Sequence, residues 1–452
     1  MPITKSVLLL DISRLFWRAR RRGPTGIDRV ELAYAQHFLG AQHERPVCAV
    51  LHVLGFLIAV SHSGARRFVE SVAARWEGAA RSGRWSDCLA LLWTYLDLLA
   101  SLDLSGIRLR RRLRRSEAPL FLVVSHHHLA RAGAIARLRR SLNVRTVCLI
   151  HDLLPLSFPE YFKRDWEKKY RRLALNLARL FDGAIVCSES TADAVRRGIE
   201  GVMAGRPTPT AQPSNLSIRV AALGVRTFPL RPAGMRGAED RPFFAVLGTL
   251  EPRKNHLLLL NLWARLSEAM AAPPRLLVIG ARGWENEQVL DMLERSRRLR
   301  GLVEEHNGLC DSEVGALLHA ARALLLPSFA EGFGLPLGEA LASGIPVICS
   351  DIGPFREVGR DAPEYLDPLN LPAWLAAVID YSRPDSARRV AQLQRLAQWR
   401  APCWADHFAA VAELLDQVAA RSITIASQIQ DAKPGSAARE RALQTVKPLP
   451  PH

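Results

Sequence analysis

The sequence predicts an α/β protein made of two doubly wound domains, each with a parallel sheet between layers of helices. Along its 452 residues, short apolar runs bounded by turn residues alternate with longer segments of helical period. This alternation is typical of parallel sheets that are covered on both faces. It is interrupted once, where residues 201–240 are rich in Pro, Gly, Ser and Ala. The interruption predicts a linker, and therefore two domains with a ligand site between their strand ends.

The N-terminal domain is expected over residues 1–230. Its buried strands are predicted at 7–10, 120–124, 146–150 and 184–187, and an amphipathic helix is predicted at 161–180. The apolar run 47–61 is interrupted by His52 and Gly55. It therefore predicts two short strands around a turn rather than one helix.

The C-terminal domain is expected over residues 241–395. Its strands are predicted at 243–247, 275–279, 323–326 and 347–349, and its helices at 257–271, 286–298 and 311–321. Residues 396–420 predict a C-terminal helix that packs back toward the N-terminal domain. Residues 421–452 are polar and end in prolines, so a flexible tail is expected there.

The composition predicts a globular protein with an anionic partner. Apolar residues make up 48% of the chain and charged residues 23%, which excludes wholesale disorder. Lys and Arg number 61 against 44 Asp and Glu, so the net charge is +17. Nucleic acid, a phosphorylated ligand or an acidic membrane face would suit this charge. No nucleic-acid motif accompanies the charge, so no nucleic acid is expected as a partner.

Cysteine usage and the absence of targeting signals favour a reducing compartment. The 7 cysteines form no CxxC pair, and several stand in apolar runs, so they are predicted to be buried and reduced. Too few apolar residues precede Asp11 for a secretory signal, and no apolar run is long enough to span a membrane. A cytoplasmic protein is expected, either soluble or peripheral on the inner membrane face.

The most informative motif is ALLLPSFAEGFGLPLGEALASGIPVICSD, residues 323–351. A buried strand leads into a glycine-rich loop that carries Glu331, and a short helix that carries Glu339 follows. Gly332 and Gly334 allow backbone N–H groups to approach a ligand closely, and the helix N-terminus favours a phosphate. The two carboxylates can accept hydrogen bonds from vicinal sugar hydroxyls.

A second motif, LGTLEPRKNHLLLL, occupies residues 247–260. A strand ends at a turn that contains Thr249, and Arg253 and Lys254 precede a helix expected to be capped near Asn255. Two adjacent cations can meet both phosphates of a diphosphate and offset the charge on a departing nucleotide. A basic pair at a helix start is by itself more often a pair of exposed surface residues without a specific function. Its position before the glutamate motif favours a functional role.

Together the two motifs resemble the retaining glycosyltransferases of family 4, which have the GT-B architecture of two Rossmann-like domains. The family's signature of a glutamate, seven residues and a second glutamate is matched by Glu331 and Glu339. The resemblance implies that Glu331 contacts the donor sugar, that Glu339 holds the ribose, and that Arg253 and Lys254 grip the donor diphosphate. The backbone implied to lie along the sugar and phosphate belongs to Phe333, Gly334 and Leu335.

Three N-terminal segments resemble the same family. The segment RRGPTGIDRVE resembles its glycine loop, with Thr-Gly in place of a double glycine, and implies donor and acceptor contacts for Gly26, Asp28 and Arg29. In CLIHDLLP, His151 stands at the end of a strand, where the resemblance places a histidine near the donor sugar. A strand-end histidine satisfied within the fold is the alternative. In VCSEST, Ser188 is implied to face the space between the domains.

No metal or other cofactor is expected. The chain contains no Asp-x-Asp triplet, which disfavours a metal-dependent GT-A enzyme. His126, His127 and His128 are consecutive, but alternate side chains of a strand point in opposite directions, so the three do not predict a metal site. The implied Arg253 and Lys254 pair instead predicts metal-independent turnover.

The N-terminal half contains a candidate membrane surface. Residues 85–102 hold Trp85, Trp93 and Tyr95 among leucines, and arginines crowd residues 108–115. An apolar aromatic helix followed by arginines is typical of a segment that lies on an anionic bilayer. A core-facing helix followed by a solvated basic turn fits the same residues, so both interpretations stay open.

The leading prediction is a retaining transfer of a sugar from a nucleotide diphosphate donor to a glycan or lipid-linked glycan. The words EPRKNH, GARGW and PTGIDRVE resemble bacterial surface-polysaccharide enzymes, many of them mannosyltransferases, which implies GDP-mannose as the donor. The alternatives are a GT-B nucleotide-sugar epimerase or hydrolase, and a basic scaffold that binds nucleotide sugar or nucleic acid without turnover. The presence of both glutamates and both cations favours turnover.

Overall fold

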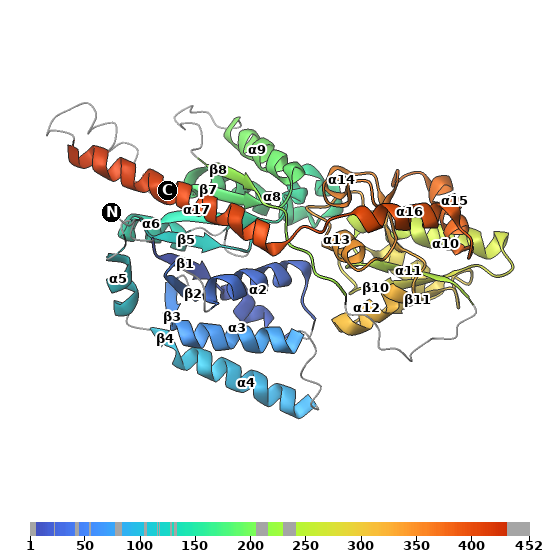
Figure 1. Ribbon diagram of the computed structural model, residues 1–452, viewed down its shortest axis with the longest axis horizontal. Helices are drawn as coiled ribbons and strands as arrows, with labels where there is room; N and C mark the ends of the chain where they lie inside the picture. Colours follow the sequence, from blue (N-terminus) through green and yellow to red (C-terminus); the bar gives the residue numbers. More distant parts are fainter. Residues whose placement is uncertain are drawn as a thin grey trace.

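The computed structural model describes residues 6–21, 23–40, 45–53, 56–76, 84–103, 106–114, 116, 118–126, 129–130, 133–204, 216–228 and 241–431. Within these residues the chain forms two sheets, each covered by helices, in two domains joined by an extended linker (Figure 1). The sheet of the N-terminal domain has the strand order β4-β3-β2-β1-β5-β6-β7-β8, and that of the C-terminal domain has the order β11-β10-β9-β12-β13-β14. The predicted fold class is confirmed.

The sheet of the N-terminal domain is parallel except at one edge, where β3 runs antiparallel to β2 and β4. Its strands are β1 (Leu8–Asp11), β2 (Val47–Val53), β3 (Phe56–Val60), β4 (Leu102–Asp103), β5 (Leu120–Val123), β6 (Arg145–Ile150), β7 (Gly183–Val186) and β8 (Ser217–Val220). Its helices are α1 (Ser13–Arg18), α2 (Gly26–Leu39), α3 (His62–Trp76), α4 (Arg84–Ala100), α5 (Ile107–Arg114), α6 (Gly133–Leu142), α7 (Leu154–Ser157), α8 (Arg164–Leu180) and α9 (Glu189–Ala204).

All strand pairs of the C-terminal domain are parallel. Its strands are β9 (Phe243–Leu247), β10 (Arg275–Ile279), β11 (Val303–His306), β12 (Leu324–Leu326), β13 (Val347–Ser350) and β14 (Glu364–Leu366). Its helices are α10 (His256–Ala269), α11 (Glu287–Arg295), α12 (Asp311–Ala320), α13 (Leu335–Ala342), α14 (Gly353–Gly359), α15 (Leu371–Ser382) and α16 (Ala387–Gln398).

The last helix, α17 (Trp404–Asp431), leaves the C-terminal domain and packs on the sheet of the N-terminal domain (Figure 1). Its His407 is hydrogen bonded to the hydroxyl of Tyr34 on α2 at 2.8 Å, and its Val418 lies against Gly183 of β7. The helix continues to Asp431, so the expected tail does not begin at residue 421. Residues 432–452 of that tail lie outside the described part of the chain.

Both sheets reverse their strand order at one point, and these points fix where a ligand site can form. In the C-terminal domain β9 lies between β10 and β12, and in the N-terminal domain β1 lies between β2 and β5. Loops that leave adjacent parallel strands in opposite directions open a crevice at the carboxyl ends of those strands. The loops after β9 and β12 carry the two motifs found in the sequence.

Candidate active site

The loops after β9 and β12 bring Arg253, Lys254 and Glu331 together. The basic pair lies on a short 3₁₀ helix, Pro252–Lys254, and Glu331 lies in the loop between β12 and α13. The two loops are tied by the backbone N–H of Phe329, which donates to the carbonyl oxygen of Arg253 at 2.8 Å. The juxtaposition therefore follows from the strand order, since neither loop is near the other in sequence.

The carboxylate of Glu331 is buried and accepts three hydrogen bonds. Lys254 Nζ donates to Oε1 at 2.5 Å, Arg253 Nη1 to Oε2 at 2.7 Å, and Ser328 Oγ to Oε1 at 2.8 Å. Burial by itself raises the pKa of Glu331, but the two cations outweigh it and lower the pKa to about 2. Glu331 is therefore ionised at every pH at which the protein would be studied.

A second carboxylate completes the charge balance of this site. Glu251 Oε1 lies 2.6 Å from Arg253 Nη2, so that two cations face two carboxylates. Burial lowers the pKa of Lys254, and the charge of Arg253 acts in the same direction, while Glu331 opposes both. An incoming diphosphate would meet two oriented cations, the buried Lys254 and the partly exposed Arg253, and would replace Glu331 as their partner.

Glycines in the loop after β12 and directly after β10 are required by close backbone approaches or by a left-handed backbone conformation. A Cβ on Gly332 would lie 2.4 Å from the carbonyl oxygen of His151, and one on Gly280 would lie 1.9 Å from that of Gly248. Gly334 has φ +99°, in the left-handed region that favours glycine. The Glu331 loop therefore passes directly over the N-terminal domain at His151.

Further bonds hold the same loop against the N-terminal domain. The carbonyl oxygen of Gly332 accepts hydrogen bonds from Ser188 Oγ at 2.8 Å and Thr191 Oγ1 at 3.1 Å. On α14, Glu357 accepts from the backbone N–H groups of Glu189 and Ser190 at the start of α9, at 2.6 and 3.0 Å. The two domains are thus closed on each other on this side of the site.

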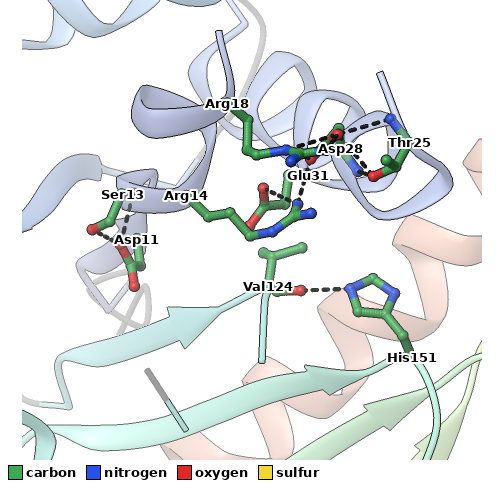
Figure 2. Close-up of polar contacts among 9 residues, drawn as sticks. All are labelled: Asp11, Ser13, Arg14, Arg18, Thr25, Asp28, Glu31, Val124 and His151. Carbon is green, nitrogen blue, oxygen red and sulfur yellow. Dashed lines mark hydrogen bonds and ion pairs between the residues drawn. The ribbon is translucent and has the colours of Figure 1, made fainter. Parts of the chain in front are cut away.

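His151 lies beside this contact as a neutral imidazole. Its Nε2 is 2.9 Å from the carbonyl oxygen of Val124, which can only accept, so Nε2 carries the proton and Nδ1 is an acceptor (Figure 2). Burial, together with His126, lowers the pKa of His151 to about 3. Its backbone N–H donates to Nε2 of His126 at 3.0 Å. His151 is therefore both satisfied within the fold and placed at the domain interface.

Asp28 is bonded to neighbouring residues of its own domain. Its side chain is fully buried and bonded to Thr25 in a capping box at the start of α2, and Arg14 and Arg18 pair with it at 2.7 and 2.8 Å (Figure 2). These contacts satisfy the Asp28 carboxylate within the N-terminal domain. The neighbouring Arg29 instead reaches the C-terminal domain, where it bonds Asp311.

The remaining predicted site residues surround the same loops. Gly26 at the start of α2 packs on Leu335, whose Cδ1 would be 3.2 Å from a Cβ at position 26. Glu339 is buried on α13, and Phe333 is buried just before it. Thr249 packs on Gly283. Sequence reasoning missed Glu251 and Ser328, which contact Arg253 and Glu331, and Arg226, which contacts Glu339.

Two kinds of feature are absent from the ranges given above. In those ranges no group of three or more His, Cys, Asp or Glu side chains is arranged to hold a metal ion. Nor does any helix there combine the length and apolar character that a membrane span requires. His127 and His128 lie outside the described residues.

The comparisons with solved structures define the class of protein. Sucrose-phosphate synthase from Thermosynechococcus elongatus superposes with a TM-score of 0.56 and 15% identity, over 92% of this chain and 100% of its own. The Anabaena protein HepE, solved with UDP, superposes with a TM-score of 0.57 and 16% identity, over 91% and 100%. At this identity the likeness establishes the fold, which is GT-B.

Family models and curated relatives then identify the family. Residues 65–202 match the Glycosyltransferase Family 4 model and residues 234–371 match Glycosyl transferases group 1. An O-antigen chain mannosyltransferase B from Escherichia coli is 36% identical over 35% of this chain and 41% of its own, and mannosyltransferase WbdA from Escherichia coli is 29% identical over 48% and 27%. The matched segments span less than half of either relative. The chain therefore contains a Glycosyltransferase Family 4 domain followed by a Glycosyl transferases group 1 domain.

Proposed function

We propose that this protein transfers a sugar, with retention of configuration, from a nucleotide diphosphate sugar to a glycan acceptor. The observation that carries the proposal is the buried cluster of Arg253, Lys254 and Glu331 at the strand-order reversal of the C-terminal domain. Nucleotide ligands of doubly wound domains bind at such a point. Cations oriented there are suited to a diphosphate leaving group.

In this proposal each residue of the site has a separate role in binding the donor or stabilising the leaving group. Arg253 and Lys254 move from Glu331 to the diphosphate and stabilise the negative charge that develops on it as the glycosidic bond breaks. The released Glu331 carboxylate accepts hydrogen bonds from hydroxyls of the donor sugar. His151, neutral with its Nδ1 as acceptor, is available to a sugar hydroxyl. Glu339 accepts from the ribose.

Mannose is the proposed sugar, and GDP-mannose the proposed donor. The O-antigen relatives are mannosyltransferases, which supports this choice and a bacterial polysaccharide as the acceptor. The test is release of nucleotide from a panel of nucleotide sugars, with and without glycan acceptor. Release that depends on acceptor supports transfer. Release without acceptor would indicate a hydrolase, conversion of the sugar without release an epimerase, and binding without turnover a scaffold.

A matched pair of variants makes this test specific to the site. Lys254→Ala removes one of the two buried cations, and Lys168→Ala removes an exposed lysine on α8. We expect Lys254→Ala to lose at least about tenfold in transfer, a change of ~1.4 kcal/mol in the activation barrier. Lys168→Ala should keep the rate of the unmodified protein. Equal rates in all three proteins would place the chemistry elsewhere.

We also propose that α4 and α5 hold the protein on an anionic membrane. Along α4, five side chains at helical spacing are between 46% and 69% exposed, namely Leu89, Leu92, Trp93, Leu96 and Leu99. The opposite face is packed, since Leu98 is buried and the hydroxyl of Tyr95 donates to the carbonyl oxygen of Phe16 at 2.6 Å. Tyr95 is therefore not part of the apolar surface that the sequence predicted.

Helix α5, which is rich in arginine, lies at the end of the N-terminal domain far from the C-terminal domain (Figure 1). On α5, Leu109 and Leu113 are buried, whereas its described arginines are exposed. A cavity of about 690 Å³ between α5 and α6 is lined by Arg110, Arg114, Arg137 and Arg140, and no carboxylate is among its described lining residues. An acidic surface contributes roughly 1 kcal/mol per nearby arginine. Trp85, Arg108 and Arg115 have no described side chains.

Liposome co-sedimentation tests the membrane proposal. We expect binding to vesicles that contain phosphatidylglycerol, weaker binding at raised salt, and little binding to phosphatidylcholine alone, because exposed charges are screened by salt. Trp93→Glu should abolish binding. Leu369→Glu, at an equally exposed apolar residue of the C-terminal domain, is the control and should not change it. Equal behaviour of the two variants would contradict the proposed surface.

A further inference from the structure

A single arginine of the interdomain linker contacts the carboxylate assigned to the ribose. Arg226 lies in the extended segment 221–228 that joins the domains. Its Nε donates to Oε1 of Glu339 at 3.1 Å, and its Nη1 donates to Oδ2 of Asp311 at 2.6 Å. The linker is anchored on both sides of this residue, because Val225 N–H donates to Pro402 O and Phe228 N–H to Ser343 Oγ. Arg226 is therefore fixed in position.

Asp311 links this arginine to the N-terminal domain. Arg29 of α2 donates to both of its oxygens, at 2.5 and 2.9 Å. The side chain of Asp311 is only 12% exposed, and this burial raises its pKa. Arg29 and Arg226 outweigh that effect and lower the pKa of Asp311 to about 2. Arg29, Asp311, Arg226 and Glu339 thus form one chain of ion pairs. We name it the clasp; it joins α2, the linker, α12 and α13.

Within the clasp only one carboxylate oxygen of Glu339 is hydrogen bonded. Its Oε1 is taken by Arg226, while no described residue donates a hydrogen bond to Oε2. Glu339 and Arg226 also line a cavity of about 140 Å³ between the domains. Burial raises the pKa of Glu339, and the charges of Arg29 and Arg226 oppose that effect. Without Arg226 the carboxylate of Glu339 would be buried with no cation hydrogen bonded to it, a state that favours its protonation.

We propose that Arg226 is a positioning residue for the donor nucleotide. Its hydrogen bond to Oε1 orients the Glu339 carboxylate so that Oε2 is left for a ribose hydroxyl, and through Asp311 and Arg29 it ties this orientation to the contact between the domains. The inference rests on the proposed function, because it assigns the ribose of a nucleotide donor to Glu339. The inference goes beyond the proposed function because it gives the linker residue Arg226 and Arg29 of the N-terminal domain a role in nucleotide binding.

The test is a cycle that changes both the protein and the ligand. GDP, UDP and their 2′,3′-dideoxy forms are titrated calorimetrically into the unmodified protein and into Arg226→Gln. In the unmodified protein we expect removal of the ribose hydroxyls to weaken binding at least tenfold. In Arg226→Gln we expect ribonucleotide binding to fall about tenfold, and loss of the hydroxyls to cost no more than about twofold further. A residue that acts only on folding would weaken both nucleotide forms equally.

Further variants keep the inference falsifiable. Arg226→Lys retains the charge but not the fork of donors, so an intermediate loss is expected, and it replaces Arg226→Gln if that variant does not fold. Arg29→Gln does not touch Glu339 and should still reduce the preference for ribose. Arg282→Gln breaks an exposed ion pair with Glu305 in the same domain and should change nothing. Unchanged ribose preference in Arg226→Gln refutes the inference alone, whereas failure of the unmodified protein to bind any nucleotide also refutes the proposed function.

Discussion

Replacing Glu331 by Gln removes one charge from the centre of the site while the shape of the side chain is kept. In the donor-free protein Glu331 is the partner of both Arg253 and Lys254, at 2.7 and 2.5 Å. Arg253 would retain its contact with Glu251 at 2.6 Å, but Lys254 would keep no carboxylate within ion-pair distance among the described residues. The main cost is therefore that of one buried cation without a partner, about 2 kcal/mol when the group can relax or lose its proton.

This cost predicts a specific pattern of stability. A loss of about 2 kcal/mol corresponds to a midpoint of thermal unfolding lower by roughly 4–8 °C for a domain of this size. A nucleoside diphosphate brings negative charge to the same two cations, so GDP should raise the midpoint of Glu331→Gln more than that of the unmodified protein. Differential scanning fluorimetry with and without GDP measures both quantities.

The same variant should transfer sugar at least about tenfold more slowly, which corresponds to ~1.4 kcal/mol. The amide still accepts a hydrogen bond, but the charge-assisted contact with the sugar is lost. Glu305→Gln is the control, because Glu305 pairs with Arg282 on the surface, away from the cluster. A Glu331→Gln rate within twofold of the unmodified protein, or an equal GDP response in both, would refute the assignment of Glu331.

Three further predictions concern the metal, the interface and pH. Transfer should persist in excess EDTA with metal-stripped buffers, because the buried cations supply the positive charge; abolition with rescue by Mg²⁺ or Mn²⁺ would contradict this. Gly332→Ala should raise the KM for the donor several-fold, because its Cβ would lie 2.4 Å from the carbonyl oxygen of His151, and small-angle scattering should report a more open molecule. Burial raises the pKa of Glu31 to about 7, although Arg14 pairs with it (Figure 2). The shift therefore contributes stability that is fully present below about pH 4.5 and is lost as the pH rises through 7. Glu31→Gln should flatten the fall of the unfolding midpoint over that range; an unchanged slope would contradict the shift.

The fold was predictable because its elements are local in sequence. Parallel strands that are buried on both faces give continuous apolar runs, and these mark β1, β5, β6, β7, β9, β10, β12 and β13 directly. The end of α17 was missed, although residues 421–431 include Ile423, Ile425 and Ile429 and carry no Gly or Pro to end a helix. Four of the six described cysteines are buried as expected, whereas Cys310 is half-buried and Cys403 is exposed.

Within the site, the sequence predicted residues whose function has a motif and missed residues whose function depends on packing. The strands β9 and β12 are neighbours in the sheet. The loops that follow them carry Arg253, Lys254 and Glu331, so the strand order brings these three residues of the two motifs together. Glu251 and Ser328 lie within the same motifs, but a glutamate or serine in a loop has many uses. Only the buried contacts with Arg253 and Glu331 separate these two from solvated side chains.

Asp28 and Arg29 show why the N-terminal assignments were harder. Adjacent residues on a helix point about 100° apart, so one contact with the C-terminal domain cannot serve both. Asp28 turns back to Thr25, Arg14 and Arg18, and Arg29 turns outward to Asp311. Which of the two faces the other domain is decided by how α2 packs on α1, and that packing is not encoded in the loop motif. An arginine beside a capping aspartate is thus a candidate interdomain contact, and here Arg29 forms one end of the clasp that reaches Glu339, the residue proposed to hold the ribose.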